Sequence, residues 1–156
     1  MNFLKEYNKQ CRLLADIQGQ IFKKSAEENI PSYFFIKVFM YSDDALLFDD
    51  LSLLTSYVST EEIYSNIAHK VKRNRGEIYN SKEIFWIGYF YRSFCYLYDV
   101  RSHTAFELVP VAHLKKAYSM YHTQDIRKAI QWVVDDLNIT FKDNQQKIYD
   151  ILRTVI

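Results

Sequence analysis

The stretch SKEIFWIGYFYRSFCYLY, residues 81–98, decides the fold of this chain. It has apolar residues on every side of a helical wheel, and Asn80 followed by Glu83 forms a capping box at its start. A helix that is apolar all round is buried on most sides. Gly88 lies in its middle, where glycine costs about 1 kcal/mol relative to alanine. We therefore expect a neighbouring helix to pack closely there, with a partner or ligand pressing on that spot as the alternative.

The composition agrees with a helix-rich core. Of the 156 residues, 49% are hydrophobic and 17% aromatic, whereas Gly occurs 3 times and Pro 2 times. A disordered chain lacks this apolar mass, phosphate-binding loops need clustered glycines, and β-sandwiches and barrels need frequent tight turns. We predict an all-α protein, an irregular single-domain bundle of seven to nine helices spanning residues 1–156 around the central aromatic helix 81–98.

Apolar periodicity and capping residues predict the other elements. Residues 50–58 fit either a short strand or an irregular helical turn. Thr123 is the expected cap of the penultimate helix and Ser102 that of a short helix before Pro110. The expected helices are 3–28, 32–41, 43–49, 59–72, 102–109, 111–120, 124–137 and 143–155, the last capped by Asp143.

The charge balance excludes a strongly basic or acidic protein. Lys and Arg number 20 and Asp and Glu 19, so the net charge of +1 gives no global attraction to nucleic acid or to an anionic membrane. The opening MNFLKEYNKQCR mixes charged and apolar residues and does not resemble a signal peptide. Cys11 and Cys95 are expected as buried thiols in a reducing compartment, with a disulfide as the alternative. We therefore expect a cytoplasmic protein that does not contact a membrane.

Arg92 stands within the apolar part of the central helix. A buried guanidinium has to meet a carboxylate or several carbonyl groups. Glu83 is about 13 Å away along the helix axis, so the partner is expected from another helix, with Asp125, Glu107 and the pair Asp43–Asp44 as candidates. A structural salt bridge is the first interpretation, and binding of an anion or a partner is the alternative.

Motifs for metal binding and nucleophilic catalysis are missing from the sequence. The four histidines form no pair spaced by four residues, there is no Cys-x-x-Cys, and no serine lies in a Gly-x-Ser-x-Gly elbow. We predict neither a metal nor a cofactor.

One basic cluster spans the end of the helix expected at 59–72. It comprises Lys70, Lys72, Arg73 and Arg75. Cations at a helix C-terminus are favoured by the helix dipole, and we interpret the cluster as a solvated helix end. Contact with phosphate or with an acidic partner is the alternative, although binding of nucleic acid is not expected from the net charge.

Three segments of the chain together carry a resemblance to a known family. They are FIKVFMYS at 35–42, EIFWIGYFYR at 83–92, and YHTQD at 121–125 followed by Ala129 and Ile130. This arrangement resembles a family of small, uncharacterised helical proteins of low-GC Gram-positive bacteria. Its members are often encoded beside ADP-ribosyltransferase-like proteins in clusters that look like toxin–antitoxin modules. The likeness covers residues 30–135, and the chain departs from it in Ile126, where the family has Pro, and in the helix expected at 143–155.

The resemblance implies a protein-interaction module, the antitoxin-like component of a bacterial or phage conflict system. Such a protein acts by occluding or sequestering a protein partner, such as a toxin encoded nearby, without chemistry of its own; a homodimer is compatible with this. The positions that the resemblance carries over form the candidate binding cluster, namely Trp86, Tyr89, Arg92, Tyr121 and His122.

A hypothesis from a different class is a helical enzyme or a nucleotide- or anion-binding protein. In it Arg92 holds an anion and His122 acts as acid or base, assisted by Glu83 or Asp125. This hypothesis requires the side chains to converge around one cavity.

Overall fold

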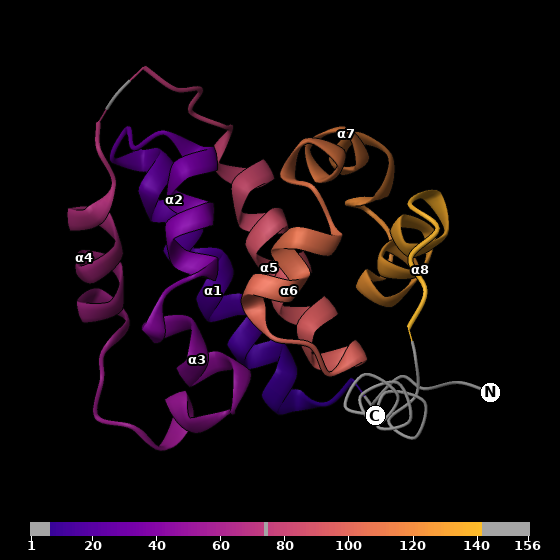
Figure 1. Cartoon of the computed structure of the whole chain (residues 1–156), viewed down its shortest axis with the longest axis horizontal. Helices are drawn as coiled ribbons and strands as arrows, with labels where there is room; N and C mark the ends of the chain where they lie inside the picture. The colour runs from indigo at the N-terminus through magenta and orange to yellow at the C-terminus, as the bar shows by residue number, and fades with distance from the viewer. Residues whose placement is uncertain (1–6, 74, 142–156) are drawn as a thin grey trace, which may run out of the picture.

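The computed structural model describes residues 7–73 and 75–141, which contain eight α-helices, one 3₁₀-helix and no strand. This confirms the all-α class and the predicted range of seven to nine helices. The elements are α1 (Lys9–Glu27), α2 (Ser32–Met40), α3 (Asp43–Asp49), the 3₁₀-helix η1 (Ser52–Thr55), α4 (Thr60–Lys70), α5 (Ser81–Tyr98), α6 (Ser102–Leu108), α7 (Val111–Tyr121) and α8 (Ile126–Asp136) (Figure 1).

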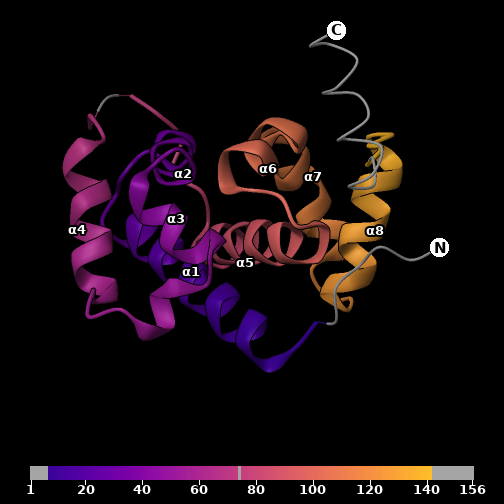
Figure 2. The ribbon, with the colours of Figure 1, turned by 60° about the horizontal axis from the view of Figure 1, so that its bottom comes forward.

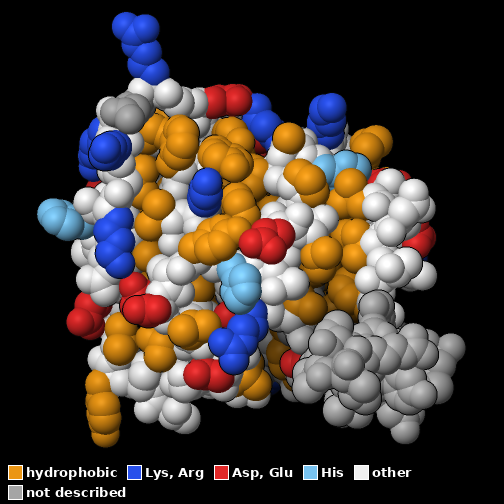
Figure 3. Space-filling view, in the orientation of Figure 1, with side chains coloured by type: hydrophobic (Ala, Val, Ile, Leu, Met, Phe, Trp, Pro, Cys, Tyr) orange, Lys and Arg blue, Asp and Glu red, His pale blue; other side chains and the backbone are white. Residues whose placement is uncertain are grey.

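Helix α5 lies at the centre of the bundle and has the predicted bounds. Helix α1 packs along it, helices α2, α3 and α4 lie on the α1 side, and α7 and α8 lie at the opposite end (Figures 1 and 2). The face seen in Figure 1 carries a broad hydrophobic area over α2 and α6 (Figure 3). Of the 18 residues of α5, 11 are buried, as expected for a helix that is apolar all round.

The close approach of α1 to α5 depends on Gly88. A Cβ atom added there would lie 2.9 Å from the ring of Phe22 and 3.1 Å from the carbonyl oxygen of Gln18, both on α1. The Gln18 side-chain amide donates a hydrogen bond of 3.0 Å to the carbonyl of Gly88. The prediction of a helix packed against Gly88 is therefore confirmed.

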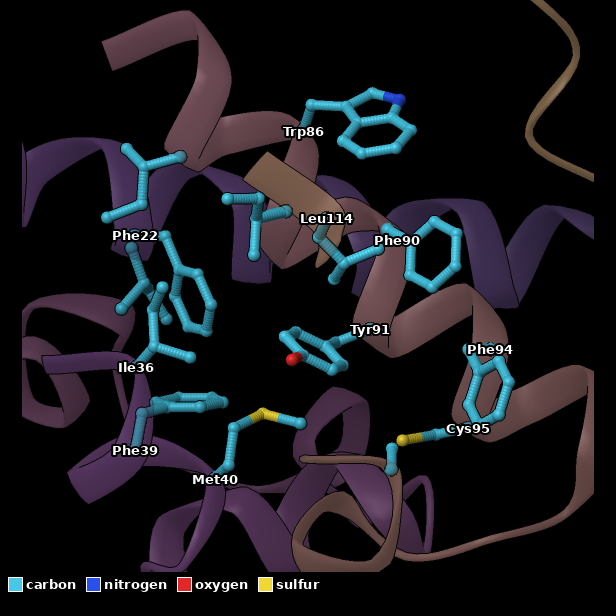
Figure 4. Packing of buried hydrophobic residues seen from close by; sticks show 14 of the residues in the cluster. Phe22, Ile36, Phe39, Met40, Trp86, Phe90, Tyr91, Phe94, Cys95 and Leu114 are labelled. Carbon is cyan, nitrogen blue, oxygen red and sulfur yellow. The ribbon is translucent and has the colours of Figure 1, made fainter. Parts of the chain in front are cut away.

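Aromatic side chains of α1, α2 and α5 meet one another within the core. Phe22 meets Phe39 edge to face at a centroid distance of 5.1 Å, an arrangement favoured by the ring quadrupoles. Tyr91 points into the interior (Figure 4) and its hydroxyl donates a hydrogen bond to the carbonyl of Val109. The buried phenol thus keeps its polar tip satisfied while its ring fills the core.

Several helix starts differ from the predicted ones. Asn8 accepts a hydrogen bond from the amide of Cys11, so α1 begins at Lys9; residues 3–6 of the predicted helix lie outside the described residues. Helix α8 begins at Ile126 because Asp125, rather than Thr123, accepts from the amide of Arg127. Asn, Asp, Ser and Thr have similar preferences for the N-cap, so neighbouring candidates are hard to rank.

Two further caps act differently from the predictions. Ser102 is the first residue of α6 and does not cap it, because its hydroxyl is used by Asp49 and Arg92. Asn80 caps α5 through the amide of Lys82, not through that of Glu83 as a capping box requires.

Residues 50–58 form η1 and irregular turns, which confirms the helical alternative for this segment. Leu51 adopts a left-handed conformation with φ 63° where the chain turns out of α3. The expected helix over 143–155 lies outside the described residues. None of the helices in the described ranges combines the length and apolarity needed to span a membrane.

Candidate functional site

A hollow of about 410 Å³ lies where the start of α1, the first half of α5 and the α7–α8 junction meet. We call it the aromatic hollow. Trp86, Tyr89 and His122, three of the five positions of the candidate binding cluster, line it together. The full lining is Tyr7, Arg12, Phe85, Trp86, Tyr89, His122, Gln124, Asp125 and Ile126.

One wall of the aromatic hollow is a hydrogen-bonded group of hydroxyls. The hydroxyl of Tyr7 donates to that of Tyr89 at 2.8 Å and lies 3.0 Å from the Ser93 hydroxyl. Burial raises the pKa of Tyr7 well above its ordinary value, and the hydrogen bond with Ser93 only partly offsets this. Tyr7 is therefore protonated at neutral pH and serves as a fixed polar group, not as a base.

The indole of Trp86 forms another part of the lining, although only 8% of this residue is exposed. Its ring meets Phe90 at 5.4 Å and, nearly perpendicular, Tyr118 at 5.8 Å. These contacts from α5 and α7 hold the indole in place. An aromatic surface fixed in this way binds an apolar group with little loss of side-chain entropy.

His122 is exposed at the end of α7. Its ring stacks on that of Tyr118 at 4.2 Å, and its Nδ1 lies 2.5 Å from the Tyr118 carbonyl oxygen. A carbonyl oxygen accepts hydrogen bonds only, so Nδ1 carries the proton and donates. In the neutral ring Nε2 is then the atom left to accept a hydrogen bond from a bound group.

Two opposite charges complete the rim of the aromatic hollow. The guanidinium of Arg12 lies 5.2 Å from the centre of the Tyr7 ring. Asp125 pairs with Arg127 at 3.1 Å, and the hydrogen bonds from Arg127 lower the pKa of its carboxyl. An aromatic floor with a mixed polar rim is typical of protein interfaces.

Arg92 does not belong to the aromatic hollow, since it is 2% exposed and lies inside the core. Its Nη1 is 2.7 Å from Asp49, its Nε donates to Gln18 at 2.8 Å and its Nη2 to Ser102 at 2.6 Å. The predicted salt bridge exists, but the candidate carboxylates named from the sequence were wrong, because the partner is Asp49 at the end of α3.

Tyr121 also lies apart from the hollow. Its hydroxyl donates to Asp136 at 3.0 Å, and its ring lies 5.1 Å from that of Trp132, so it joins α7 to α8. Successive helical residues are turned by about 100°. Tyr121 and His122 therefore face different surroundings, and the five-residue cluster is divided between the hollow, the core and the α7–α8 contact.

The basic cluster Lys70, Lys72, Arg73 and Arg75 is exposed at the end of α4 and in the segment that follows. The guanidinium of Arg73 reaches the backbone carbonyl of Glu28 at 3.5 Å. This position at a helix C-terminus agrees with a solvated helix end.

Both cysteines are free and buried. Burial raises the pKa of Cys11 and of Cys95 to about 12, so both thiols are protonated and poorly nucleophilic at neutral pH. Within the described ranges, no three His, Cys, Asp or Glu side chains come together as ligands for a metal ion.

No pattern in the sequence indicates that Tyr7, Arg12 and Phe85 line the same hollow as His122. Tyr7 and Tyr89 are 82 residues apart and meet only because α1 packs along α5. The spacing of apolar residues in 3–28 pointed to the buried face of that helix but not to its neighbour. Comparison of the chain with family models, with curated proteins and with solved structures finds no match.

Proposed function

We propose that this protein is a cytoplasmic interaction module that binds a protein partner through the aromatic hollow. We further propose that it is the antitoxin-like component of a bacterial or phage conflict system, occluding or sequestering a partner encoded nearby. The conflict-system setting rests on the resemblance described above. The observation that carries the binding role is that Trp86, Tyr89 and His122, which the resemblance singles out, line one hollow.

The chemistry of the aromatic hollow supports recognition of a protein. Trp, Tyr and Arg are the residues most enriched at the energetic centres of interfaces, and Trp86, Tyr89 and Arg12 supply all three. The hydrogen bond between Tyr7 and Tyr89 orients the wall before a partner arrives. A partner side chain that enters the hollow therefore meets a surface that is already ordered.

The alternative, an enzyme or an anion-binding protein that uses Arg92 and His122 together, is less well supported by the geometry. His122 lines the aromatic hollow, whereas the nitrogens of Arg92 are directed to Gln18, Asp49 and Ser102 in the core. An anion at Arg92 would have to displace Asp49. The two side chains do not converge on one cavity, as that hypothesis requires.

Co-expression with the product of the adjacent gene, followed by affinity capture, tests the proposal. The double variant Arg12→Glu, His122→Ala changes two exposed side chains of the aromatic hollow, and we expect it to weaken capture at least tenfold, or about 1.4 kcal/mol. The matched control is Arg75→Glu, His69→Ala, which makes the same changes at exposed positions near the end of α4 and should capture normally.

Two results would count against this function. A wild-type protein that captures no product of a neighbouring gene removes the conflict-system role. If Arg75→Glu, His69→Ala weakens capture while Arg12→Glu, His122→Ala leaves it unchanged, the partner does not use the aromatic hollow, and the basic cluster becomes the better candidate.

A further inference from the structure

Helices α2 and α6 lie side by side and expose an aromatic surface on the face seen in Figure 3. Tyr33 is 41% exposed, Phe34 46% and Tyr41 49%. Single exposed aromatic residues are common on protein surfaces and need no explanation. Tyr33 and Phe34 lie on α2 and Tyr41 directly follows it, so the three exposed rings are gathered at one short helix, and an apolar surface gathered in this way marks an interaction site.

Ring contacts join these residues to α6. Phe106 lies 6.0 Å from Tyr33 and 5.7 Å from Tyr41, and His103 lies 6.1 Å from Tyr41, measured between ring centroids. The aromatic surface is therefore continuous from one helix to the other. We call it the α2–α6 face, made up of Tyr33, Phe34, Lys37, Tyr41, His103, Phe106 and Glu107.

Two charges of opposite sign lie within the α2–α6 face. Lys37 is exposed and stands four residues from both Tyr33 and Tyr41, in the same row along α2. Glu107 is exposed on α6 and accepts a hydrogen bond of 2.8 Å from the Tyr41 hydroxyl. Neither has an ion-pair partner within the described ranges. The face thus combines an apolar surface with one unpaired cation and one unpaired anion.

We propose that the α2–α6 face is the interface between two copies of this chain, related by a two-fold axis. In such an interface both copies use the same patch. Lys37 of the first copy meets Glu107 of the second, and Glu107 of the first copy meets Lys37 of the second. A face that carried charges of only one sign would repel a second copy of itself, whereas the α2–α6 face carries both signs and is complementary to itself. A partner whose surface carried charge of only one sign would bury either Lys37 or Glu107 without an ion-pair partner, which costs binding free energy.

This interface is separate from the aromatic hollow. Tyr91 lies 6.4 Å from Phe106 and so marks the side of α5 that α6 covers, whereas Tyr89 lines the hollow. Two helical residues separated by two positions are turned by about 200°. The face and the hollow lie on different sides of α5, and a dimer formed through α2 and α6 leaves the hollow open.

Sedimentation of the purified full-length chain, between about 1 and about 500 µM, tests the proposal. The wild type should pass from monomer to dimer over this range. Lys37→Glu and Glu107→Lys should each weaken dimerisation at least tenfold, because symmetry places every reversed charge twice in the interface. The double variant Lys37→Glu, Glu107→Lys should restore it. Lys116→Glu, an exposed reversal on α7, is the control and should dimerise like the wild type.

Three outcomes of these sedimentation measurements would contradict the proposed interface. A wild type that is monomeric throughout the range rejects the dimer. Two single reversals that leave dimerisation unchanged, or a double variant that stays as weak as either single one, reject the pairing of Lys37 with Glu107 and with it the proposed interface. The exchanged residues are exposed, and thermal unfolding of each variant checks that the fold is retained.

Discussion

The guanidinium of Arg92 lies 2.7 Å from the carboxylate of Asp49, with side-chain exposures of only 2% and 7%. Asp49 ends α3 and also accepts hydrogen bonds from the amide and hydroxyl of Ser102, at the start of α6. Gln18 of α1 accepts from the same guanidinium. One side chain of α5 thereby connects three other helices, and its charge is balanced inside the core.

Removing the Asp49 carboxylate should leave the Arg92 guanidinium buried and unpaired. We expect Asp49→Ala to lower the free energy of unfolding by about 3–5 kcal/mol, measured by urea denaturation. Asp50→Ala is the matched control: this neighbour is exposed and accepts hydrogen bonds from the amide and hydroxyl of Ser52, so its loss should cost less than about 1 kcal/mol. Equal losses in the two variants would mean that the pair with Arg92 does not hold the helices together.

The contact between α1 and α5 predicts different outcomes for two helical glycines. In Gly88→Ala the new methyl group meets the ring of Phe22, which is fully buried and cannot move. Overpacking should exceed the gain in helix propensity and cost about 1–2 kcal/mol. In Gly19→Ala the methyl group meets the outer edge of the Phe85 ring, which is only partly buried. This ring can shift, so the loss should be smaller, and a larger loss for Gly19→Ala in thermal unfolding would contradict this reasoning.

The raised pKa values of the thiols predict instability at alkaline pH. Burial raises the pKa of Cys11 and Cys95 from 9.0 to about 12. Above pH 9 the unfolded chain loses these protons while the folded chain keeps them, so the folded state binds more protons and stability falls as the pH rises. The loss should reach about 1–2 kcal/mol per thiol at pH 10.

Urea denaturation between pH 7 and pH 10 measures this dependence. A variant with both Cys11→Ala and Cys95→Ala serves as the control, and its stability should fall less steeply over the same range, whatever its stability at pH 7. Identical slopes for the variant and the wild type would show that the thiols do not cause the alkaline loss.

The fold was more predictable from sequence than the site, for a physical reason. The periodicity of apolar residues and the positions of helix-breaking residues are local signals. They located α5 and indicated that a helix must approach Gly88. They do not say which helices meet. Arg92 needed a carboxylate, but Asp49 becomes its partner only because α3 packs beside α5 and α6, where Ser102 also bonds to Asp49.

The candidate cluster shows the same limit in another form. The resemblance places the adjacent residues Tyr121 and His122 in one cluster, yet helical geometry turns them to different surroundings. The aromatic hollow depends on Tyr7, which comes from a segment 82 residues before Tyr89. Only the packing of α1 on α5 joins the two, and no local pattern contains that information.

The two tryptophans offer a direct test of partner binding at the aromatic hollow. Trp86 lines the hollow, whereas Trp132 is 38% exposed on α8, beside Tyr121. We expect titration with the captured partner to change the emission of the Trp132→Phe variant, which reports Trp86, because an occupied hollow excludes water from the indole. The Trp86→Phe variant, which reports Trp132, should show little change when bound to the same partner. A response confined to Trp132 would place the partner on α8 and reject the hollow as the binding site, even if capture itself succeeds.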